Sequence, residues 1–273
     1  MISELLFIKE EVMQNIEILF EDEDILVCYK SAGLAVQSSR VTEPDLESML
    51  RSQLNRRGEK GGLIHVIHRL DQPVEGILVF AKNKKAAASL SGQVQSKGEM
   101  SKNYLAVVFG ILPDGEKEKA LFNYIDRDKQ TGSAVIVEEE NLTDSAKKAA
   151  LSYKVLEEIT IKREKIVEFK AKEADADDNT KKDKRSISLL KISLDTGRFH
   201  QIRAQLSNMG YPIMGDRRYF TEDSNALSRE LMVRNVALCA YKLNFKHPKT
   251  GQDMEFKIQP KGEIFRRFSI VAE

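Results

Sequence analysis

The residues best suited to chemistry stand together in the run His68-Arg69-Leu70-Asp71. Asp71 follows an arginine, which is a permanent cation, and His68 could supply a second positive charge. Cations at this spacing would hold a carboxylate ionised at neutral pH. An ionised, positioned carboxylate can act as a nucleophile or a general base. An isolated Asp in such a corner is more often part of a surface ion pair, so the run alone leaves both interpretations open.

Two apolar runs flank this acid and predict the strands that support it. Residues 63–67 and 77–81 are rich in Ile, Leu and Val and have strand length. Pro73 and Gly76, between them, carry turn chemistry. We therefore expect Asp71 at the end of a strand, on a rigid support.

Other segments have equally local signals. Residues 16–20 and 25–29 predict a hairpin across an acidic turn, and residues 187–194 predict a later strand. Apolar residues at helical spacing predict a helix that opens at Pro44-Asp45. Asn83 is a suitable N-cap for a second helix, which we expect to run to about residue 97.

Two more segments hold aromatic and charged side chains that could serve a functional site. Residues 102–108 have the composition of a strand and contain Tyr104, whose flat ring could stack on a base with about 1 to 3 kcal/mol per base. A strand tyrosine taken alone is more often core packing. The second segment, after the predicted strand at 187–194, reads Asp195-Thr196-Gly197-Arg198-Phe199-His200-Gln201-Ile202-Arg203.

These segments, in this order, resemble the RluA-type pseudouridine synthases. His68 to Asp71, followed by the run from Gly76 to Lys82, is similar to the catalytic motif of that family. Residues 102–106 and 196–203 are similar to two further family segments. Val74-Glu75 departs from the pattern, because the family usually has Thr-Ser there. The likeness covers about residues 16–260.

The segment Lys30-Ser31-Ala32-Gly33-Leu34 also resembles a family segment, with Ser31 in place of the family's proline. From the residues alone, we interpret Gly33 as the residue that allows a tight turn.

The resemblance implies an enzyme, an isomerase that converts specific uridines in rRNA or tRNA to pseudouridine with a catalytic aspartate. By position, the catalytic residues would be Asp71, Tyr104 and Arg203, with Arg203 facing Asp71. The residues expected to bind RNA are His68, Arg69, Lys82, Arg198, His200, Gln201 and Arg218. We expect no cofactor and no metal.

The resemblance also implies an α+β fold with a mixed, largely antiparallel central sheet, flanking helices and an active-site cleft. We expect a short N-terminal arm at residues 1–15 and one catalytic domain at residues 16–273. No RNA-binding S4 domain is expected ahead of it. Residues 171–184 are charged and almost free of large apolar groups, which predicts a flexible insertion.

The composition is that of a soluble globular protein, with 41% hydrophobic and 31% charged residues among 273. We expect a cytoplasmic monomer without a membrane segment. Cys28 and Cys239 each lie in an apolar segment, which predicts buried thiols and not a disulfide. Forty-three basic residues against 42 acidic ones give a net charge of +1, so any basic RNA-binding surface must be local.

Two rival functions follow from the same residues. The first is a catalytically inactive RNA-binding protein that keeps the synthase fold, supported by the Val74-Glu75 departure, the expected lack of an S4 domain and the near-neutral charge. The second, a glycoside hydrolase, is weaker, because the sequence offers no pair of carboxylates with a defensible spatial relation.

Overall fold

The computed structural model describes residues 16–38, 43–58, 63–96, 98–113, 117–162 and 185–269. The chain divides into two units, the first made of Met1–Asn103 with Cys239–Pro260 and the second of Tyr104–Leu238 with Lys261–Glu273. The predicted arm at residues 1–15 and the predicted insertion at 171–184 lie outside the described residues. That residues 16–273 act as one catalytic domain stays a prediction.

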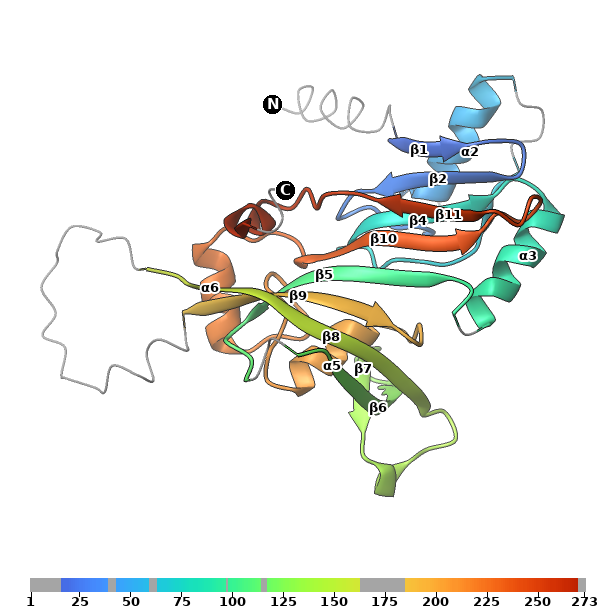
Figure 1. The fold of residues 1–273 in the computed structure, drawn as a ribbon. Coiled ribbons are helices and arrows are strands. Elements are labelled where there is room, and N and C mark those ends of the chain that lie inside the picture. The colour runs from blue at the N-terminus through green and yellow to red at the C-terminus, as the bar shows by residue number, and fades with distance from the viewer. Residues whose placement is uncertain are drawn as a thin grey trace, which may run out of the picture. The chain divides into compact units, whose positions relative to one another are not determined.

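Strands and helices occur in both units (Figure 1). The first unit holds β1 (Ile18–Glu21), β2 (Ile25–Lys30), α2 (Leu46–Arg56), β3 (His65–Val66), β4 (Glu75–Ala81), α3 (Lys84–Gln95), nearly all of β10 (Leu238–Lys246), and β11 (Asp253–Lys257). β5 (Ser101–Phe109) begins in the first unit and continues into the second. The second unit then holds β6 (Lys119–Arg127), β7 (Ala134–Val137), the 3-10 turn η1 (Glu139–Asn141), β8 (Lys147–Thr160), β9 (Ser186–Leu194), α5 (Gln201–Asn208), α6 (Glu222–Glu230) and the 3-10 turn η2 (Glu263–Arg267).

The sheet of the first unit follows the order β1-β2-β4-β10, with β3 paired to β4 and β11 paired to β10. Only the β4–β10 pair among these is parallel; the others are antiparallel. β2 and β4 are buried along their whole length, as expected for central strands without a polar face. The predicted hairpin at residues 16–29 is confirmed by the β1–β2 pairing.

Capping residues determine where α2 and α3 begin. Asp45 accepts a hydrogen bond from the Ser48 backbone N–H at 2.8 Å, and the Ser48 hydroxyl completes a capping box. Asn83 accepts from the Ala86 N–H at 2.9 Å and starts α3, as predicted. α3 ends at Gln95, slightly before the expected residue 97.

Two details around the catalytic motif differ from the sequence prediction. The strand expected at residues 63–67 is only the two-residue β3, so Asp71 lies in a loop and not at a strand end. Gly76 lies inside β4 and not in a turn. Its φ of +140° favours glycine, and an added Cβ would come within 2.6 Å of Ala240 in β10. Gly76 is therefore required by close strand packing.

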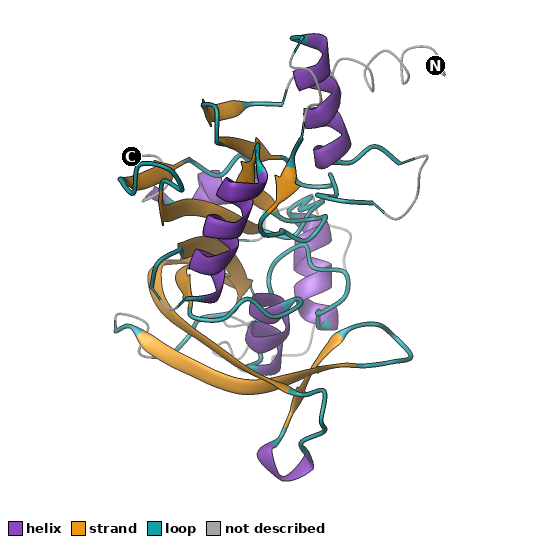
Figure 2. Ribbon diagram, turned by 90° about the vertical axis from the view of Figure 1, so that its right-hand side faces the viewer, coloured by secondary structure: helices purple, strands orange, loops and turns teal. Residues whose placement is uncertain are grey.

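The second unit contains a sheet in the order β5-β9-β8-β6-β7. β8 is a 14-residue strand that pairs antiparallel with both β6 and β9. Figure 2 shows the strands of the protein in orange and its helices in purple. α5 packs against β6 and β7, and Ala204 joins Ile125, Ala134 and Ala149 in a small apolar cluster. Helices on mixed, mostly antiparallel strands confirm the α+β fold class.

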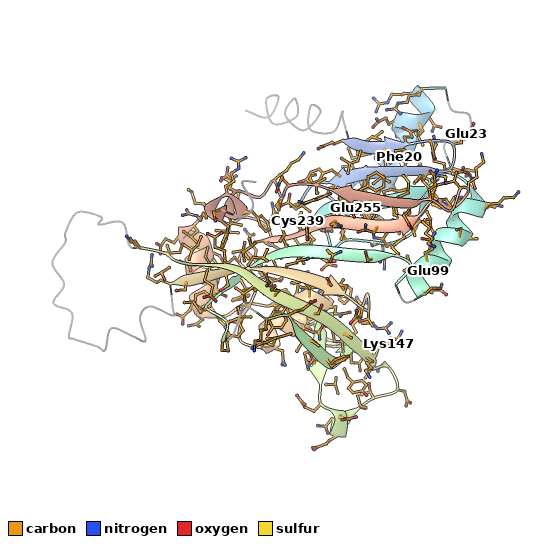
Figure 3. The ribbon with its side chains drawn as sticks, viewed as in Figure 1. Phe20, Glu23, Glu99, Lys147, Cys239 and Glu255 are labelled. Carbon is orange, nitrogen blue, oxygen red and sulfur yellow. The ribbon has the colours of Figure 1, made fainter. Side chains whose placement is uncertain are left out.

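Cys28 and Cys239 are free and buried, which confirms the thiol prediction. Cys239 lies in β10 (Figure 3). Within the described parts of the chain, no helix is both long and apolar enough to cross a bilayer.

Candidate active-site residues

Asp71 lies in the loop that joins β3 to β4. Its backbone carbonyl accepts a hydrogen bond from the Val74 N–H at 3.0 Å, which closes a turn. Leu70 and Val74, on either side, are buried, whereas Asp71 itself is half-buried. The loop is thus anchored by its apolar residues, and Asp71 keeps partial exposure.

A buried lysine holds this loop from the side. The Lys30 side chain has no exposed surface, and its Nζ donates to the backbone carbonyls of Ser31 at 3.0 Å, Leu34 at 2.7 Å and Gln72 at 3.1 Å. An ammonium group has three N–H donors, so these acceptors match it. Gln72 is tied again through Gly33, whose N–H donates to the Gln72 carbonyl at 2.8 Å. Lys30 therefore joins the turn after β2 to the residue that follows Asp71.

The charge of Lys30 is finely balanced. Burial lowers the pKa of its ammonium group to about 7, against the opposing attraction of Asp71 and Glu75. A lysine cation lies close to the candidate catalytic carboxylate, a role that we did not predict for it. The signal was present in the segment from Lys30 to Leu34, which we interpreted only as a turn. Gly33 does make that turn, with a φ of +91°.

His68 does not provide the second positive charge that we expected. Burial lowers the pKa of its imidazole well below the usual value, with a smaller contribution from the nearby Lys102. The ring nitrogen Nε2 accepts a weak hydrogen bond from the Val79 N–H at 3.4 Å, as a neutral imidazole can. Arg69, by contrast, is exposed. Of the two cations proposed beside Asp71 in sequence, His68 is therefore not one at neutral pH.

Lys82 is engaged within the protein. Its Nζ lies 2.8 Å from Glu21 Oε1, and Arg57 holds the other oxygen of Glu21 at 2.8 Å. Burial alone would raise the pKa of Glu21, but the hydrogen bonds from Lys82 and Arg57 lower it overall. Lys82 would have to leave this pair to contact a phosphate.

The Val74-Glu75 departure lies in the interior. Both side chains are buried, and the Tyr29 hydroxyl donates to Glu75. Burial, followed by the hydrogen bond to Glu75, raises the pKa of Tyr29. The two residues that differ from the family pattern therefore affect packing behind the Asp71 loop, and they offer no surface to a substrate. This weakens the main support for the inactive-protein alternative.

In the second unit, Arg203 forms a buried bidentate ion pair. Its Nε and Nη2 donate to the two carboxylate oxygens of Asp216 at 2.7 and 2.9 Å. Asp216 also accepts from the backbone N–H groups of Arg218 and Tyr219. The guanidinium carbon of Arg203 lies 5.1 Å from the centre of the Tyr219 ring. Asp216 and Tyr219, which we did not predict as site residues, fix the orientation of Arg203.

Gln201 has a structural position. It is buried, its Oε1 accepts from Thr196 Oγ1 at 2.8 Å and the Arg198 N–H at 3.0 Å, and its Nε2 donates to the Ala150 carbonyl at 3.0 Å. These bonds fasten the loop before α5 to β8. The expectation that Gln201 touches RNA directly is not supported, because its amide faces the interior.

His200 contacts the exposed ring of Phe199 on one side and, on the other, Tyr219, which packs on Arg203. Its imidazole stacks on Phe199 with ring centres 3.7 Å apart, and its Nδ1 shares a hydrogen bond of 2.9 Å with the Tyr219 hydroxyl. His200 adopts a left-handed φ of 50°, which is uncommon outside glycine. Such backbone strain occurs where surrounding contacts hold a side chain in a required place.

The remaining predicted residues divide by exposure. Arg198 and Arg218 are exposed, although each also donates to backbone carbonyls, Arg198 to Lys148 at 2.9 Å and Arg218 to Thr131 at 3.3 Å. Tyr104, by contrast, is buried in β5. Arg198 and Arg218 can meet a polyanion as they stand.

One group of possible metal ligands occurs among the described residues. Asp22, Asp24 and His247 place their ligand atoms within 4.8 Å of one another. His247 Nε2 lies 2.8 Å from Asp22, while its Nδ1 accepts from the backbone N–H groups of Lys249 and Thr250. Asn83 donates to Asp24 at 2.7 Å. Hydrogen bonds within the protein thus account for this cluster.

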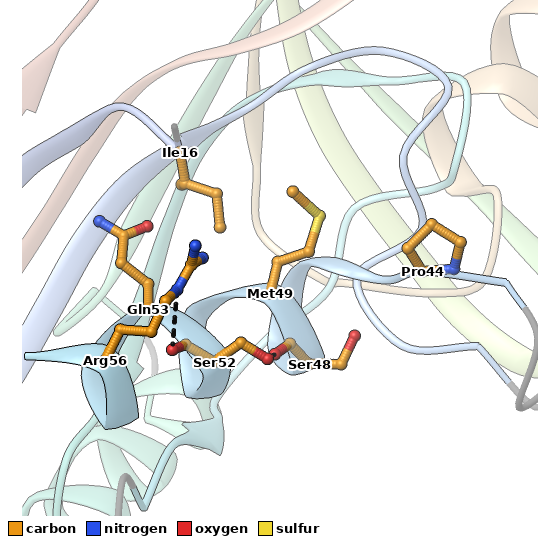
Figure 4. Close-up of a pocket in the computed structure, with 7 residues that line it drawn as sticks. All are labelled: Ile16, Pro44, Ser48, Met49, Ser52, Gln53 and Arg56. Atoms are coloured by element: carbon orange, nitrogen blue, oxygen red, sulfur yellow. Dashed lines mark hydrogen bonds between the residues drawn. The ribbon is translucent and has the colours of Figure 1, made fainter. Parts of the chain in front are cut away.

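A hollow of about 190 Å³ on α2 lies apart from the catalytic motif in sequence (Figure 4). It is lined by Ile16, Pro44, Ser48, Met49, Ser52, Gln53 and Arg56. Of these seven, only Arg56 is charged, and none belongs to the residues predicted to act on RNA. The hollow has no groups for acid–base chemistry.

Comparison with known proteins shows to which family the chain belongs. Residues 24–208 match the model of the RNA pseudouridylate synthase family, a span that includes Asp71, Tyr104 and Arg203. The chain belongs to the RNA pseudouridylate synthase family. Its activity is that of an RNA pseudouridine synthase, an isomerase, and the resemblance found in the sequence is confirmed.

Curated relatives support the same family. An RNA pseudouridine synthase of Helicobacter pylori (strain J99 / ATCC 700824), described as uncharacterized, is 32% identical over 92% of this chain and 68% of its own length. The ribosomal large subunit pseudouridine synthase D of Nitrosomonas europaea is 30% identical over 87% of this chain and 60% of its own length. The tRNA pseudouridine synthase C of Haemophilus ducreyi is 29% identical over 87% of this chain and 88% of its own length.

Among solved structures, human RNA pseudouridylate synthase domain containing 4 is similar to this chain, with a TM-score of 0.67 and 18% identity. The match covers 94% of each chain. At this identity the likeness concerns the fold, and it confirms the expected pseudouridine synthase fold.

Proposed function

We propose that this synthase isomerises specific uridines of ribosomal or transfer RNA and that Asp71 is its catalytic carboxylate. The observation that carries the assignment is the clamped loop: Asp71 is half-buried, and Lys30 ties the adjacent Gln72 to the turn after β2. A catalytic group must be held in a defined place, and these contacts provide the support.

The reaction exchanges one glycosidic bond for another. The target uridine leaves its stack so that the carboxylate can reach it, which costs a few kcal/mol. Asp71 promotes cleavage of the bond from N1 to C1′, the uracil turns, and C5 bonds to C1′. The proton on C5 is released and N1 gains one, so no electron donor or acceptor is consumed.

The other roles follow from position and charge. Arg203, oriented by Asp216, would face Asp71 and keep it ionised, and Tyr104 would lie beside the target base. The exposed Arg69, Arg198 and Arg218 would contact phosphates, which position an RNA without specifying its sequence. For that task we favour these arginines over His68, Lys82 and Gln201, because the latter three make contacts within the protein.

The RNA class is supported by the names of the relatives, one of which is a ribosomal RNA enzyme and another a transfer RNA enzyme. We propose further that the protein works in the cytoplasm as a monomer. Its two buried free thiols suit a reducing compartment.

Profiling pseudouridine in the ribosomal and transfer RNA of host cells with and without the gene tests this function. We expect at least one uridine position to lose its modification in the cells without the gene and to regain it when the gene is restored. An unchanged profile in both RNA classes would contradict the proposed substrates.

A further inference from the structure

Phe199 is a large aromatic side chain that remains 45% exposed, just before His200, the N-cap of α5. A single exposed apolar residue is ordinary. This one is set apart by its supports, because its ring stacks on His200 at 3.7 Å with only 21° between the planes. An exposed ring that is held by a fixed second ring is pre-organised to stack on one more flat group.

A cation completes the arrangement. The guanidinium carbon of the exposed Arg127, at the end of β6, lies 5.0 Å from the centre of the Phe199 ring. Stacking of a base on an aromatic ring is stronger than an exposed cation–π contact. A nucleobase can therefore take the place of the guanidinium, which is then free to meet the adjoining phosphate.

The support beneath Phe199 leads to the buried ion pair. His200 is bonded to Tyr219, and the Tyr219 ring lies under the guanidinium of Arg203. Tyr219 is held in turn by the Ala134 N–H, which donates to its hydroxyl at 2.6 Å. A base on Phe199 would therefore be connected, through the stacked His200 and the edge-on Tyr219, to Arg203, a residue assigned to the active site.

We propose that Phe199, with Arg127, is a stacking platform for an unpaired base of the RNA substrate. The proposal rests on the proposed RNA substrate and adds a residue that engages RNA without taking part in bond exchange. Stacking tolerates any base, so this contact would favour single-stranded or looped RNA over a duplex.

Phe122 is a matched control for Phe199. It lies in β6, the strand that also holds Arg127, but on the opposite face. Phe122 in β6 is 59% exposed and has the ammonium nitrogen of Lys148 5.6 Å from its ring centre. Successive side chains in a strand alternate, so Phe122 and Arg127, five positions apart, point to opposite faces of the sheet. Phe122 thus shares the exposure and the cation but lacks a stacked histidine and a path to Arg203. Lys147, beside Lys148 at the start of β8, is labelled in Figure 3.

Fluorescence provides a direct measurement, because the chain contains no tryptophan. Phe199→Trp and Phe122→Trp each give the protein a single tryptophan, whose fluorescence can be excited separately from that of the seven tyrosines. The probes are a single-stranded oligouridylate, which has bases and phosphates, and inorganic polyphosphate, which has the charge alone. We expect oligouridylate to quench Phe199→Trp by about half and to leave Phe122→Trp unchanged, with polyphosphate quenching neither.

Several results would overturn the platform. They are an unquenched Phe199→Trp, equal quenching by polyphosphate, equal quenching of Phe122→Trp, or no binding of oligouridylate by the unmodified protein at low salt. Each bears on the platform alone, because turnover by the unmodified protein, followed separately by tritium release from C5 of uridine, tests the function.

Kinetics of a second variant distinguish binding from a loss of structure. Phe199→Leu keeps an apolar side chain but removes the flat ring. We expect its KM for RNA to rise about tenfold, which corresponds to about 1.4 kcal/mol, with kcat within about twofold of the unmodified enzyme. A fall in kcat at unchanged KM would show that Phe199 serves the catalytic step or the fold, and would contradict the platform.

Discussion

Asp216 is the residue on which the orientation of Arg203 depends. Both side chains are buried, and the two hydrogen bonds between them are 2.7 and 2.9 Å long. Removing one member of such a pair leaves the other charge buried without compensation.

Asp216→Ala should therefore lower the free energy of unfolding by about 3 to 5 kcal/mol. Urea denaturation measures this, and Arg218→Ala, at an exposed neighbour, should change it by less than about 0.5 kcal/mol. A loss below about 1 kcal/mol in Asp216→Ala would show that Arg203 finds other compensation.

Lys30 gives the stability a specific pH dependence. Burial lowers the pKa of its ammonium group from 10.5 in the unfolded chain to about 7 in the folded protein. Between these values the unfolded state binds more protons, so this group makes stability rise with pH from about 7 towards 10.

The unmodified protein should therefore gain stability relative to Lys30→Met as the pH rises from about 7 to 9, by up to about 1.4 kcal/mol per pH unit. Urea denaturation of both proteins across that range gives the difference. A difference that stays level or falls with pH would mean that the three carbonyl acceptors keep Lys30 fully charged.

At the scale of elements, the contact between β4 and β10 limits which residue can occupy position 76. An added Cβ would lie 2.6 Å from the Ala240 Cβ, backbone nitrogen and carbonyl oxygen, and the φ of +140° is unfavourable for any side chain. Backbone atoms of a paired strand cannot move away cheaply.

Gly76→Ala should destabilise the protein by at least about 2 kcal/mol. Gly92→Ala is the matched control, since Gly92 lies in α3 with nothing within 4 Å of the new Cβ, and it should stabilise by up to about 1 kcal/mol. Equal effects of the two changes in thermal or urea unfolding would argue against the packing constraint.

The elements predicted well from sequence are those with local signals. Asn83 and Asp45 begin helices because their side chains cap the next turn, and the hairpin at residues 16–29 follows from two apolar runs. The failures depend on distant partners. Ala240, remote in sequence, makes Gly76 a packing residue, and no local pattern in the sequence indicated that β3 would be so short.

The candidate site shows the same division at the scale of the whole molecule. Sequence similarity to the family was sufficient to select Asp71, Tyr104 and Arg203 as candidate residues, and all three lie within the span that matches the family model. Sequence similarity could not predict that the Gln201 side chain is buried or that the His68 ring is neutral, because the role of Gln201 and the pKa of His68 both depend on burial in the folded protein. Asp216 was missed because its role arises from a tertiary contact.

The whole account depends on one carboxylate acting on RNA uridine. The most direct measurement compares the unmodified protein with Asp71→Asn on a cellular RNA that it modifies, labelled with tritium at C5 of uridine. Isomerisation replaces that hydrogen, so tritium enters water with each turnover. We predict steady release by the unmodified protein and none above background by Asp71→Asn, which should bind the same RNA with a Kd within about threefold. Release by Asp71→Asn within about tenfold of the unmodified rate would contradict the assignment of Asp71.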